Sequence, residues 1–245
     1  MPSHSARPPI FVYQMGKVGS CSVQHTVAAG TNQRVVHGHC LPEMAESTRR
    51  ELAEALQHGQ TVHVISPVRD PISRNVSAFF QNFERDVGTA VATRDWSVNE
   101  LLALFLQRYP HRSCLQWFDE EFRPHFGLDV FDRPFDADRK WQVYERGPVR
   151  LLVYRTDLDL GVQLEVISSF LGHRLERWVM ANCSADKSYG PLYREFCRQA
   201  VLPESYLQEM GHSRYFRHFW SEPEIAGHVR RWRSQPGRDL VKLAS

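Results

Sequence analysis

The chain has 245 residues, of which 42% are hydrophobic and 24% are charged, as in an ordinary soluble globular domain. A net charge of +2 excludes a strongly basic nucleic-acid binder on bulk charge, although it allows a local anion site. Five cysteines without a CxxC pair argue against metal and disulfide frameworks and favour a reducing compartment. The N-terminal residues lack a signal-peptide core, and no apolar run is long enough to cross a bilayer. We therefore expect a single soluble, cytoplasmic domain without a nucleic-acid partner.

The first patterned stretch is predicted to be a strand, a glycine loop and a helix. Ile10–Tyr13 is apolar, β-branched and aromatic, which is typical of a buried strand. Gly16 and Gly19 then break the run with Lys17 between them, and a helix is expected to begin near Ser20. The N-terminus of such a helix attracts an anion, and Lys17 adds a mobile positive charge. The loop is not a Walker A motif, because its lysine precedes the second glycine, and an ordinary strand-to-helix turn is the alternative interpretation.

The chain continues as a strand, a helix and a strand, over residues 34–40, 43–58 and 61–66. The alternation of strands and helices predicts a parallel sheet with right-handed crossovers. Ligands of such sheets bind beyond the carboxyl ends of the strands. Lys17, His39 and Arg69 all follow expected strand ends, so we expect them to face one crevice.

A second informative stretch runs from Pro67 to Asp86. Asp70 is a suitable helix cap, and Pro71 suits the first helical position. Arg69 lies just outside this helix and Ser77 lies two turns along it, so the two side chains are spaced to hold a phosphate. A capped amphipathic helix that packs on the core is the alternative, but it leaves Arg69 and Ser77 without a role.

The rest of the chain is predicted to be mostly helical. Helices are expected over residues 98–109, 113–122, 158–171, 187–200 and 203–210, and within 215–233. Two strands over residues 141–145 and 149–154 flank a turn signal at 146–148, and one of them is expected to be an antiparallel edge.

The two informative stretches together resemble the sulfotransferases that use 3′-phosphoadenosine-5′-phosphosulfate (PAPS). Residues 17–22 resemble the loop that holds the 5′-phosphosulfate, and Arg69 and Ser77 have the spacing of the residues that bind the 3′-phosphate. Residues 12–20 are most similar to bacterial proteins labelled as capsular polysaccharide synthesis proteins, of the same P-loop-like superfamily. The stretch 37–39 resembles a His-Gly-His of heparan sulfate 2-O-sulfotransferases, in which the second histidine is the catalytic base. The resemblance covers residues 10–83 and is weak beyond, apart from a late cofactor-covering loop at 182–189.

The resemblance implies an α/β fold with a P-loop-NTPase-like parallel sheet flanked by helices and a helical C-terminal part. It implies a sulfotransferase-like domain with a cofactor-binding core over residues 10–86, acceptor-side segments over 87–145, and a completing strand and C-terminal helices over 146–245. The implied reaction moves a sulfuryl group from PAPS to a hydroxyl acceptor, a saccharide, and leaves adenosine 3′,5′-bisphosphate. A sulfuryl group carries less charge than a phosphoryl group, so no metal is required.

The expected site follows from this resemblance and from the strand ends. A histidine titrates in the right range for the base, with His39 as the first choice, His37 as the second and the carboxylate Glu43 as an alternative. Lys17 is expected to be catalytic as well. The residues expected to bind the cofactor are Lys17, Val18, Gly19, Ser20, Cys21, Ser22, Arg69, Ser77, Lys187 and Ser188.

Two other functions stay open. A nucleotide-dependent kinase would use the strand end at 151–157 to bind a metal, but the chain lacks a matching Walker A motif. A non-catalytic nucleotide-binding protein of polysaccharide assembly is the other alternative, and the presence of Lys17, His39, Arg69 and Ser77 argues against it. The residues specify neither the acceptor nor an oligomeric state.

Overall fold

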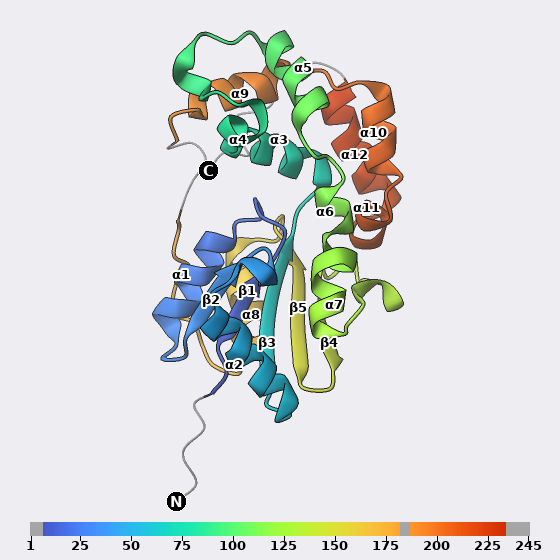
Figure 1. Ribbon diagram of the computed structural model, residues 1–245. Helices are drawn as coiled ribbons and strands as arrows, with labels where there is room; N and C mark the ends of the chain where they lie inside the picture. The colour runs from blue at the N-terminus through green and yellow to red at the C-terminus, as the bar shows by residue number, and fades with distance from the viewer. Residues whose placement is uncertain (1–6, 182–186, 234–245) are drawn as a thin grey trace, which may run out of the picture. The chain divides into compact units, whose positions relative to one another are not determined.

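The computed structural model describes residues 7–181 and 187–233, in two compact units. Unit 1 comprises Met1–Arg69 and Gln116–Asn182, and unit 2 comprises Asp70–Leu115 and Cys183–Ser245. Figure 1 shows the elements of each unit along the chain. Compactness alone does not define domains, so the expected single domain stays a prediction.

Unit 1 is built on a sheet whose described strands follow the order β2-β1-β3-β5-β4. The four strands β1, β2, β3 and β5 run parallel in this sheet, whereas β4 pairs antiparallel with β5. The sheet expected to be parallel is therefore mixed and mostly parallel, because a tight turn at Gly147 returns the chain directly into its neighbour. The antiparallel edge expected from the turn signal is confirmed. The strands are β1 (Ile10–Tyr13), β2 (Val35–Gly38), β3 (Val62–Val68), β4 (Trp141–Arg146) and β5 (Val149–Arg155).

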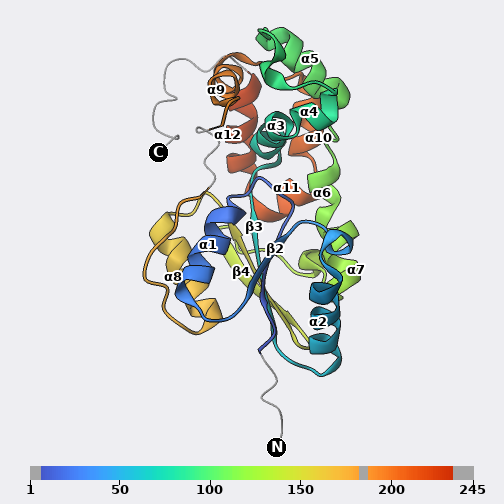
Figure 2. The ribbon, with the colours of Figure 1, turned by 60° about the vertical axis from the view of Figure 1, so that its left-hand side comes forward.

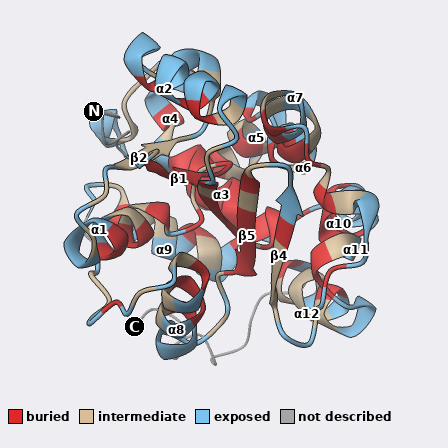
Figure 3. Ribbon diagram, turned by 90° about the horizontal axis from the view of Figure 1, so that it is seen from below, coloured by how far each residue is buried: buried red, intermediate tan, exposed pale blue. Residues whose placement is uncertain are grey.

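Helices cover both faces of this sheet. Figure 2 shows α1 (Ser20–Gly30) and α8 (Leu160–Leu171) on one face, and α2 (Glu46–Gln57) and α7 (Arg123–Phe126) on the other. A sheet covered on both faces needs apolar side chains on both, and β1 is accordingly buried at every position. Figure 3 shows the same burial along β1 and β5. The flanked α/β sheet expected from the sequence is confirmed.

Unit 2 is helical in its described part, which confirms the expected helical C-terminal part. The rings of Phe79, Phe80, Phe105 and Phe196 lie at the centre of this unit, with centroids 5.4–6.1 Å apart in the pairs that touch. Its helices are α3 (Pro71–Gln81), α4 (Phe83–Val87), α5 (Val98–Arg108), α9 (Gly190–Gln199), α10 (Glu204–Gly211), α11 (Arg214–Phe219) and α12 (Glu222–Arg233).

The helix expected over residues 113–122 is only partly α-helical. It consists of α6 (Ser113–Trp117) and a π-helical turn, Phe118–Phe122. Short 3₁₀ turns occur at Leu41–Glu43, Val91–Thr93 and Val130–Asp132. Within residues 7–181 and 187–233, the helices are all too short or too polar to span a membrane.

The cap of α3 yields a prediction about stability. Asp70 is 7% exposed, and its Oδ1 accepts a hydrogen bond from the backbone N–H of Ser73 at 2.8 Å. Asp70→Ala should lower the free energy of unfolding by about 1–2 kcal/mol, because the first turn loses its acceptor. Asp70→Asn should recover most of that loss, since its amide oxygen can still accept. Urea unfolding of the three proteins measures the difference, and equal losses in both variants would contradict the cap.

Candidate functional site

The candidate site lies at the carboxyl edge of the unit 1 sheet, in the loop that joins β1 to α1. Gly16, Lys17 and Gly19 have φ angles of 81°, 63° and 70°, which are all left-handed. This conformation costs a non-glycine residue such as Lys17 about 1–2 kcal/mol, so the surrounding loop must hold it there. Left-handed turns of this kind gather backbone N–H groups on one side, which is how anion-binding nests form.

The hydroxyl groups at the start of α1 already have partners inside unit 1. Ser20 Oγ lies 2.8 Å from His37 Nε2. Ser22 Oγ accepts a hydrogen bond from the N–H of Ala181 at 3.0 Å and donates to its carbonyl at 3.2 Å. Val18 is buried, and Cys21 is half-buried. The start of α1 therefore presents its backbone, rather than these two hydroxyl groups, to a ligand.

Arg69 follows β3 and reaches this loop. Its Nη1 donates to the backbone carbonyl of Lys17 at 3.4 Å, so the structure brings together two residues that the sequence placed at neighbouring strand ends. Ser77 is 2% exposed in α3 of unit 2. The two residues belong to different units, and a phosphate site that joins Arg69 to Ser77 stays a prediction.

The late loop expected to cover a cofactor is only partly described. Lys187 and Ser188 are exposed and precede α9 in unit 2. Residues 182–186 of the same loop lie outside the described residues. The expected contacts of Lys187 and Ser188 with a cofactor stay a prediction.

Gln14 joins the loop to the two histidines. Its side chain is fully buried, its Oε1 accepts from the N–H of Gly16, and its Nε2 lies 2.8 Å from His39 Nδ1 and 3.3 Å from His37 Nε2. The backbone carbonyl oxygen of Gln14 is also 2.8 Å from His39 Nδ1. The centroids of the two imidazole rings are 5.1 Å apart, so Gly38 does not turn the rings away from each other.

The two histidines differ in their surroundings. Burial, helped by the charges of His39 and His25, lowers the pKa of His37 from 6.5 to about 4. His37 is therefore neutral at pH 7, and its Nε2 can accept the hydrogen bond of the Ser20 hydroxyl. His39 is exposed, with Nδ1 against Gln14. Of the two residues, His39 is the more exposed to solvent or an acceptor.

A further set of contacts, which the sequence did not reveal, fixes the chain on either side of His39. Trp117 Nε1 donates to the backbone carbonyl of His39 at 2.8 Å, and Cys40 Sγ lies 3.2 Å from Glu121 Oε1. Glu121 belongs to the π-helical turn Phe118–Phe122, and turns of this type are frequent at functional sites. The only sequence signal was an expected helix at this position.

Tyr13 connects that turn to the sheet. Its hydroxyl accepts from the N–H of Leu41 at 2.8 Å and donates to Glu121 Oε2 at 2.9 Å. Burial, together with the hydrogen bond to Glu121 and its charge, holds the pKa of Tyr13 above its ordinary range. The ring also packs on Trp117 and Phe126, with centroids 5.1 and 5.6 Å apart. The end of β2 is thus held from two sides.

At the strand end considered for a metal, the carboxylate of Asp157 is paired with positively charged side chains. Asp157 Oδ1 accepts from Arg155 Nε at 3.0 Å, and Oδ2 accepts from Lys140 Nζ at 3.2 Å. Burial acts to raise the pKa of Asp157, but the hydrogen bonds and charges of Arg155 and Lys140 outweigh it and lower the pKa. In the part of the chain that the structure describes, His, Cys, Asp and Glu side chains form no group of three or more that could hold a metal ion.

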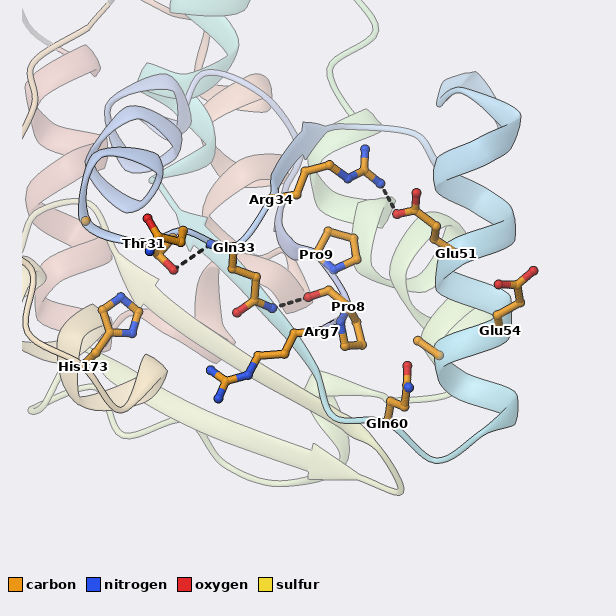
Figure 4. A pocket seen from close by; sticks show the side chains of 13 residues that line it. Arg7, Pro8, Pro9, Thr31, Gln33, Arg34, Glu51, Glu54, Gln60 and His173 are labelled. Atoms are coloured by element: carbon orange, nitrogen blue, oxygen red, sulfur yellow. Dashed lines mark hydrogen bonds and ion pairs between the residues drawn. The ribbon is translucent and has the colours of Figure 1, made fainter. Parts of the chain in front are cut away.

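A cavity of about 1010 Å³ lies at the other, amino edge of the sheet (Figure 4). It is lined by residues that precede β1, β2 and β3, and none of the residues expected at the site contributes to it. Its charges are mixed, and Arg34 pairs with Glu51 inside it. Since parallel sheets bind ligands beyond their carboxyl ends, we take the edge with Lys17 and His39 as the candidate site.

Fold and site together define an α/β protein with a glycine loop and a histidine pair at the carboxyl edge of its sheet. A family model described as "Putative capsular polysaccharide synthesis protein" (NKWYS) matches residues 94–221, just over half of the chain. The chain belongs to this family. This confirms the family that was expected from the sequence of residues 12–20. Neither the curated proteins nor the solved structures gave a match.

The matched residues differ from those that carry the resemblance to sulfotransferases. The family match begins at residue 94, whereas that resemblance covers residues 10–83. Membership thus connects the chain with polysaccharide synthesis and leaves the reaction to be argued from the site. The match does include Trp117 and Glu121, which hold the end of β2.

The depressed pKa of His37 predicts a loss of stability in acid. Below pH 6.5 the unfolded chain binds a proton at His37 that the folded chain, with a pKa of about 4, does not bind. Stability therefore falls as pH drops through this window. The loss at this partly exposed ring should be about 1 kcal/mol between pH 7 and pH 5, with screening by solvent included.

Urea unfolding at pH 7 and pH 5 measures this loss. In His37→Gln, the loss of unfolding free energy between pH 7 and pH 5 should be smaller by about that amount. His58 is exposed at the end of α2, so the control variant His58→Gln should show the same loss as the unchanged protein. A His37→Gln protein that loses as much stability in acid as the unchanged protein would contradict the assignment.

Proposed function

We propose that this chain is a sulfotransferase that moves a sulfuryl group from PAPS to a hydroxyl of a carbohydrate acceptor, on a P-loop-like α/β unit. The observation that carries the proposal is the junction at Gln14. There a left-handed loop containing Lys17 meets an exposed histidine, His39, while Arg69 contacts the loop from the next strand. An anion site beside a candidate base is what transfer from an anionic donor to a hydroxyl requires.

The residues fit the two ends of PAPS. The loop offers the backbone around Gly19 and Ser20 and the positive end of the α1 dipole, and Lys17 adds a charge for a 5′-phosphosulfate. Arg69 beside the same loop supplies a planar, charged donor for a 3′-phosphate. PAPS supplies the sulfuryl group when bound.

His39 is the proposed base because of the state of its ring. The backbone carbonyl of Gln14, 2.8 Å from Nδ1, can only accept and favours a proton on Nδ1 with the lone pair on Nε2. The amide nitrogen of Gln14, also 2.8 Å from Nδ1, favours the other tautomer, and the proposed base is the Nδ1–H form. Nε2 then takes the proton of the acceptor hydroxyl. His37 is less suited, because it is neutral with a low pKa and its Nε2 already faces Ser20 Oγ. Lys17 stabilises the charge that develops on the leaving phosphate.

The capsular polysaccharide family supports a saccharide as the acceptor. A kinase fits less well, because the carboxylate of Asp157 is held by Arg155 and Lys140. A non-catalytic protein of polysaccharide assembly fits the family equally well, and only an assay separates it from an enzyme.

The test incubates the full chain with ³⁵S-labelled PAPS and a mixed glycan pool, and measures label in the glycans. Transfer that disappears in Lys17→Ala supports the proposal. Phosphate transfer from labelled ATP in a parallel reaction would favour the kinase. Binding of adenosine 3′,5′-bisphosphate without transfer to any glycan would favour the non-catalytic protein.

The assignment of Arg69 predicts a selective loss of affinity. Charge-assisted hydrogen bonds are worth about 1.5–3 kcal/mol, so Arg69→Ala should weaken binding of adenosine 3′,5′-bisphosphate by about ten- to a hundredfold. Binding of adenosine 5′-phosphate, which lacks the 3′-phosphate, should hardly change. Calorimetry measures both ligands, with Arg49→Ala on the exposed face of α2 as the control. Equal losses for the two ligands would refute the assignment.

The assignment of His39 predicts a loss of turnover without a loss of cofactor. His39→Ala should lower kcat by about a hundred- to ten-thousandfold and leave bisphosphate affinity within about twofold, because a base touches the acceptor and not the cofactor. His37→Ala should have the smaller effect on kcat. Initial rates and calorimetry on both variants provide the test. An inactive His37→Ala together with an active His39→Ala would show that His37 is the base.

A further inference from the structure

Every polar group of Gln14 is used by the loop or by the histidine strand. The side chain donates and accepts at the same time, with Oε1 bonded to Gly16 and Nε2 facing the rings of His37 and His39. The backbone N–H donates to the carbonyl of Gly38 at 3.2 Å, and the backbone carbonyl lies against His39 Nδ1. A side-chain amide with 0% exposure needs such partners, since an unsatisfied buried polar group is costly.

The orientation of the Gln14 amide follows from its contacts. The N–H of Gly16 can only donate, so the atom that faces it must be the amide oxygen. The amide nitrogen must therefore face the two histidines. A flipped amide would place two donors against each other at Gly16, which excludes the alternative.

Two groups of Gln14 favour opposite neutral tautomers of His39. The backbone carbonyl oxygen, 2.8 Å from Nδ1, accepts only and favours a proton on Nδ1. The side-chain Nε2, also 2.8 Å from Nδ1, donates only and favours the lone pair on Nδ1. The side chain of Gln14 therefore acts directly on the balance between the two neutral tautomers of His39.

We propose that Gln14 is a positioning residue that couples the glycine loop to His39, holding the loop through Oε1 and setting the tautomer and orientation of the His39 ring through Nε2. The inference rests on the proposed function only where it treats His39 as the base. The same side chain that fixes the turn into the anion loop then also shifts the balance between a lone pair on Nδ1 and a lone pair on Nε2 of the His39 ring.

Other side chains that can be charged lie around Gln14 and His39, and the test does not change them. His37 faces His39 on β2, and the charge of His25 on α1 acts on His37. Cys40 follows β2 and contacts Glu121 of the turn Phe118–Phe122, and Lys17 lies in the glycine loop. Variants of Gln14 leave all of them in place, so a change at His39 can be assigned to Gln14.

Two substitutions separate the two halves of the proposal. Gln14→Glu keeps an oxygen for Gly16 but replaces the amide nitrogen with a second acceptor that carries charge. Gln14→Met keeps the approximate shape and removes both hydrogen-bonding groups. Gln163→Glu and Gln163→Met are the matched controls, because Gln163 is also buried in unit 1 and its Nε2 donates to the carbonyl of Leu158 at 2.7 Å.

The measurements are NMR spectra of the ¹⁵N-labelled full chain. Long-range nitrogen–proton correlations report the tautomer and pKa of each histidine ring, with His39 assigned by the loss of its signals in His39→Ala. Amide hydrogen exchange reports the bond at Gly16. Thermal melting of each variant confirms that it is folded.

The expected results differ between the variants. Both Gln14 variants should shift neutral His39 toward the Nδ1–H tautomer. Gln14→Glu should raise the His39 pKa more than Gln14→Met, by about one unit or more, because a carboxylate stabilises the protonated ring whereas Met only removes a donor. Gly16 should exchange about tenfold faster in Gln14→Met, because its acceptor is lost, and at the original rate in Gln14→Glu. The Gln163 variants should change none of these readings.

An unchanged His39 tautomer in both folded Gln14 variants would overturn the proposal, and so would an unchanged Gly16 exchange rate in Gln14→Met. None of these readings uses PAPS or an acceptor. If sulfate transfer fails while the NMR results are as expected, Gln14 positions His39 and the proposed reaction is wrong. If transfer occurs and the NMR readings stay unchanged, the reaction stands and the role of Gln14 is wrong.

Discussion

The parallel pairing of β1 with its two neighbours is the constraint on which the candidate site depends. Val12 pairs with His37 and Tyr13 with Gly38, so β1 and β2 end at the same level. β3 pairs with the other side of β1, through Phe11 with Val64 and Val12 with Ile65. Three strand ends thereby deliver the glycine loop, the histidines and Arg69 to one edge. A change of register would separate these groups, even if every helix and strand still formed.

Much of unit 1 could be predicted because its signals are local. The apolar run at Ile10–Tyr13, the glycines that follow and the turn at 146–148 each specify an element over a few residues. The placement of Lys17, His39 and Arg69 after neighbouring strand ends follows from the alternation of strands and helices. That argument requires only the general rule that ligands bind beyond the carboxyl ends of parallel strands.

The partners of individual polar groups could not be predicted, because they lie far apart in the sequence. The hydroxyl of Ser22 is bonded to Ala181, 159 residues away, and the expected contact of Ser22 with a cofactor stays a prediction. Gln14 directly follows the apolar run, and its buried side chain lies against His37 and His39, contacts that no local pattern specifies. Tyr13 likewise looked like a core ring only, although its hydroxyl holds Glu121 and Leu41.

The residues matched by the family model include one segment of unit 1 that contacts the candidate site. Trp117 and Glu121 lie inside the matched residues 94–221, and both contact the chain around His39. The histidine strand itself lies outside the match. The matched residues therefore include side chains that support the end of β2, and the loop and histidines outside the match supply the chemistry that we propose.

A crystal structure of the full chain with adenosine 3′,5′-bisphosphate tests the central claim most directly. We expect the 5′-phosphate at the N-terminus of α1, on the backbone around Gly19 and Ser20 and beside Lys17, and the 3′-phosphate on the guanidinium of Arg69. Bisphosphate bound instead in the cavity lined by Arg7 and Arg34 at the amino edge, with the loop empty, would contradict it.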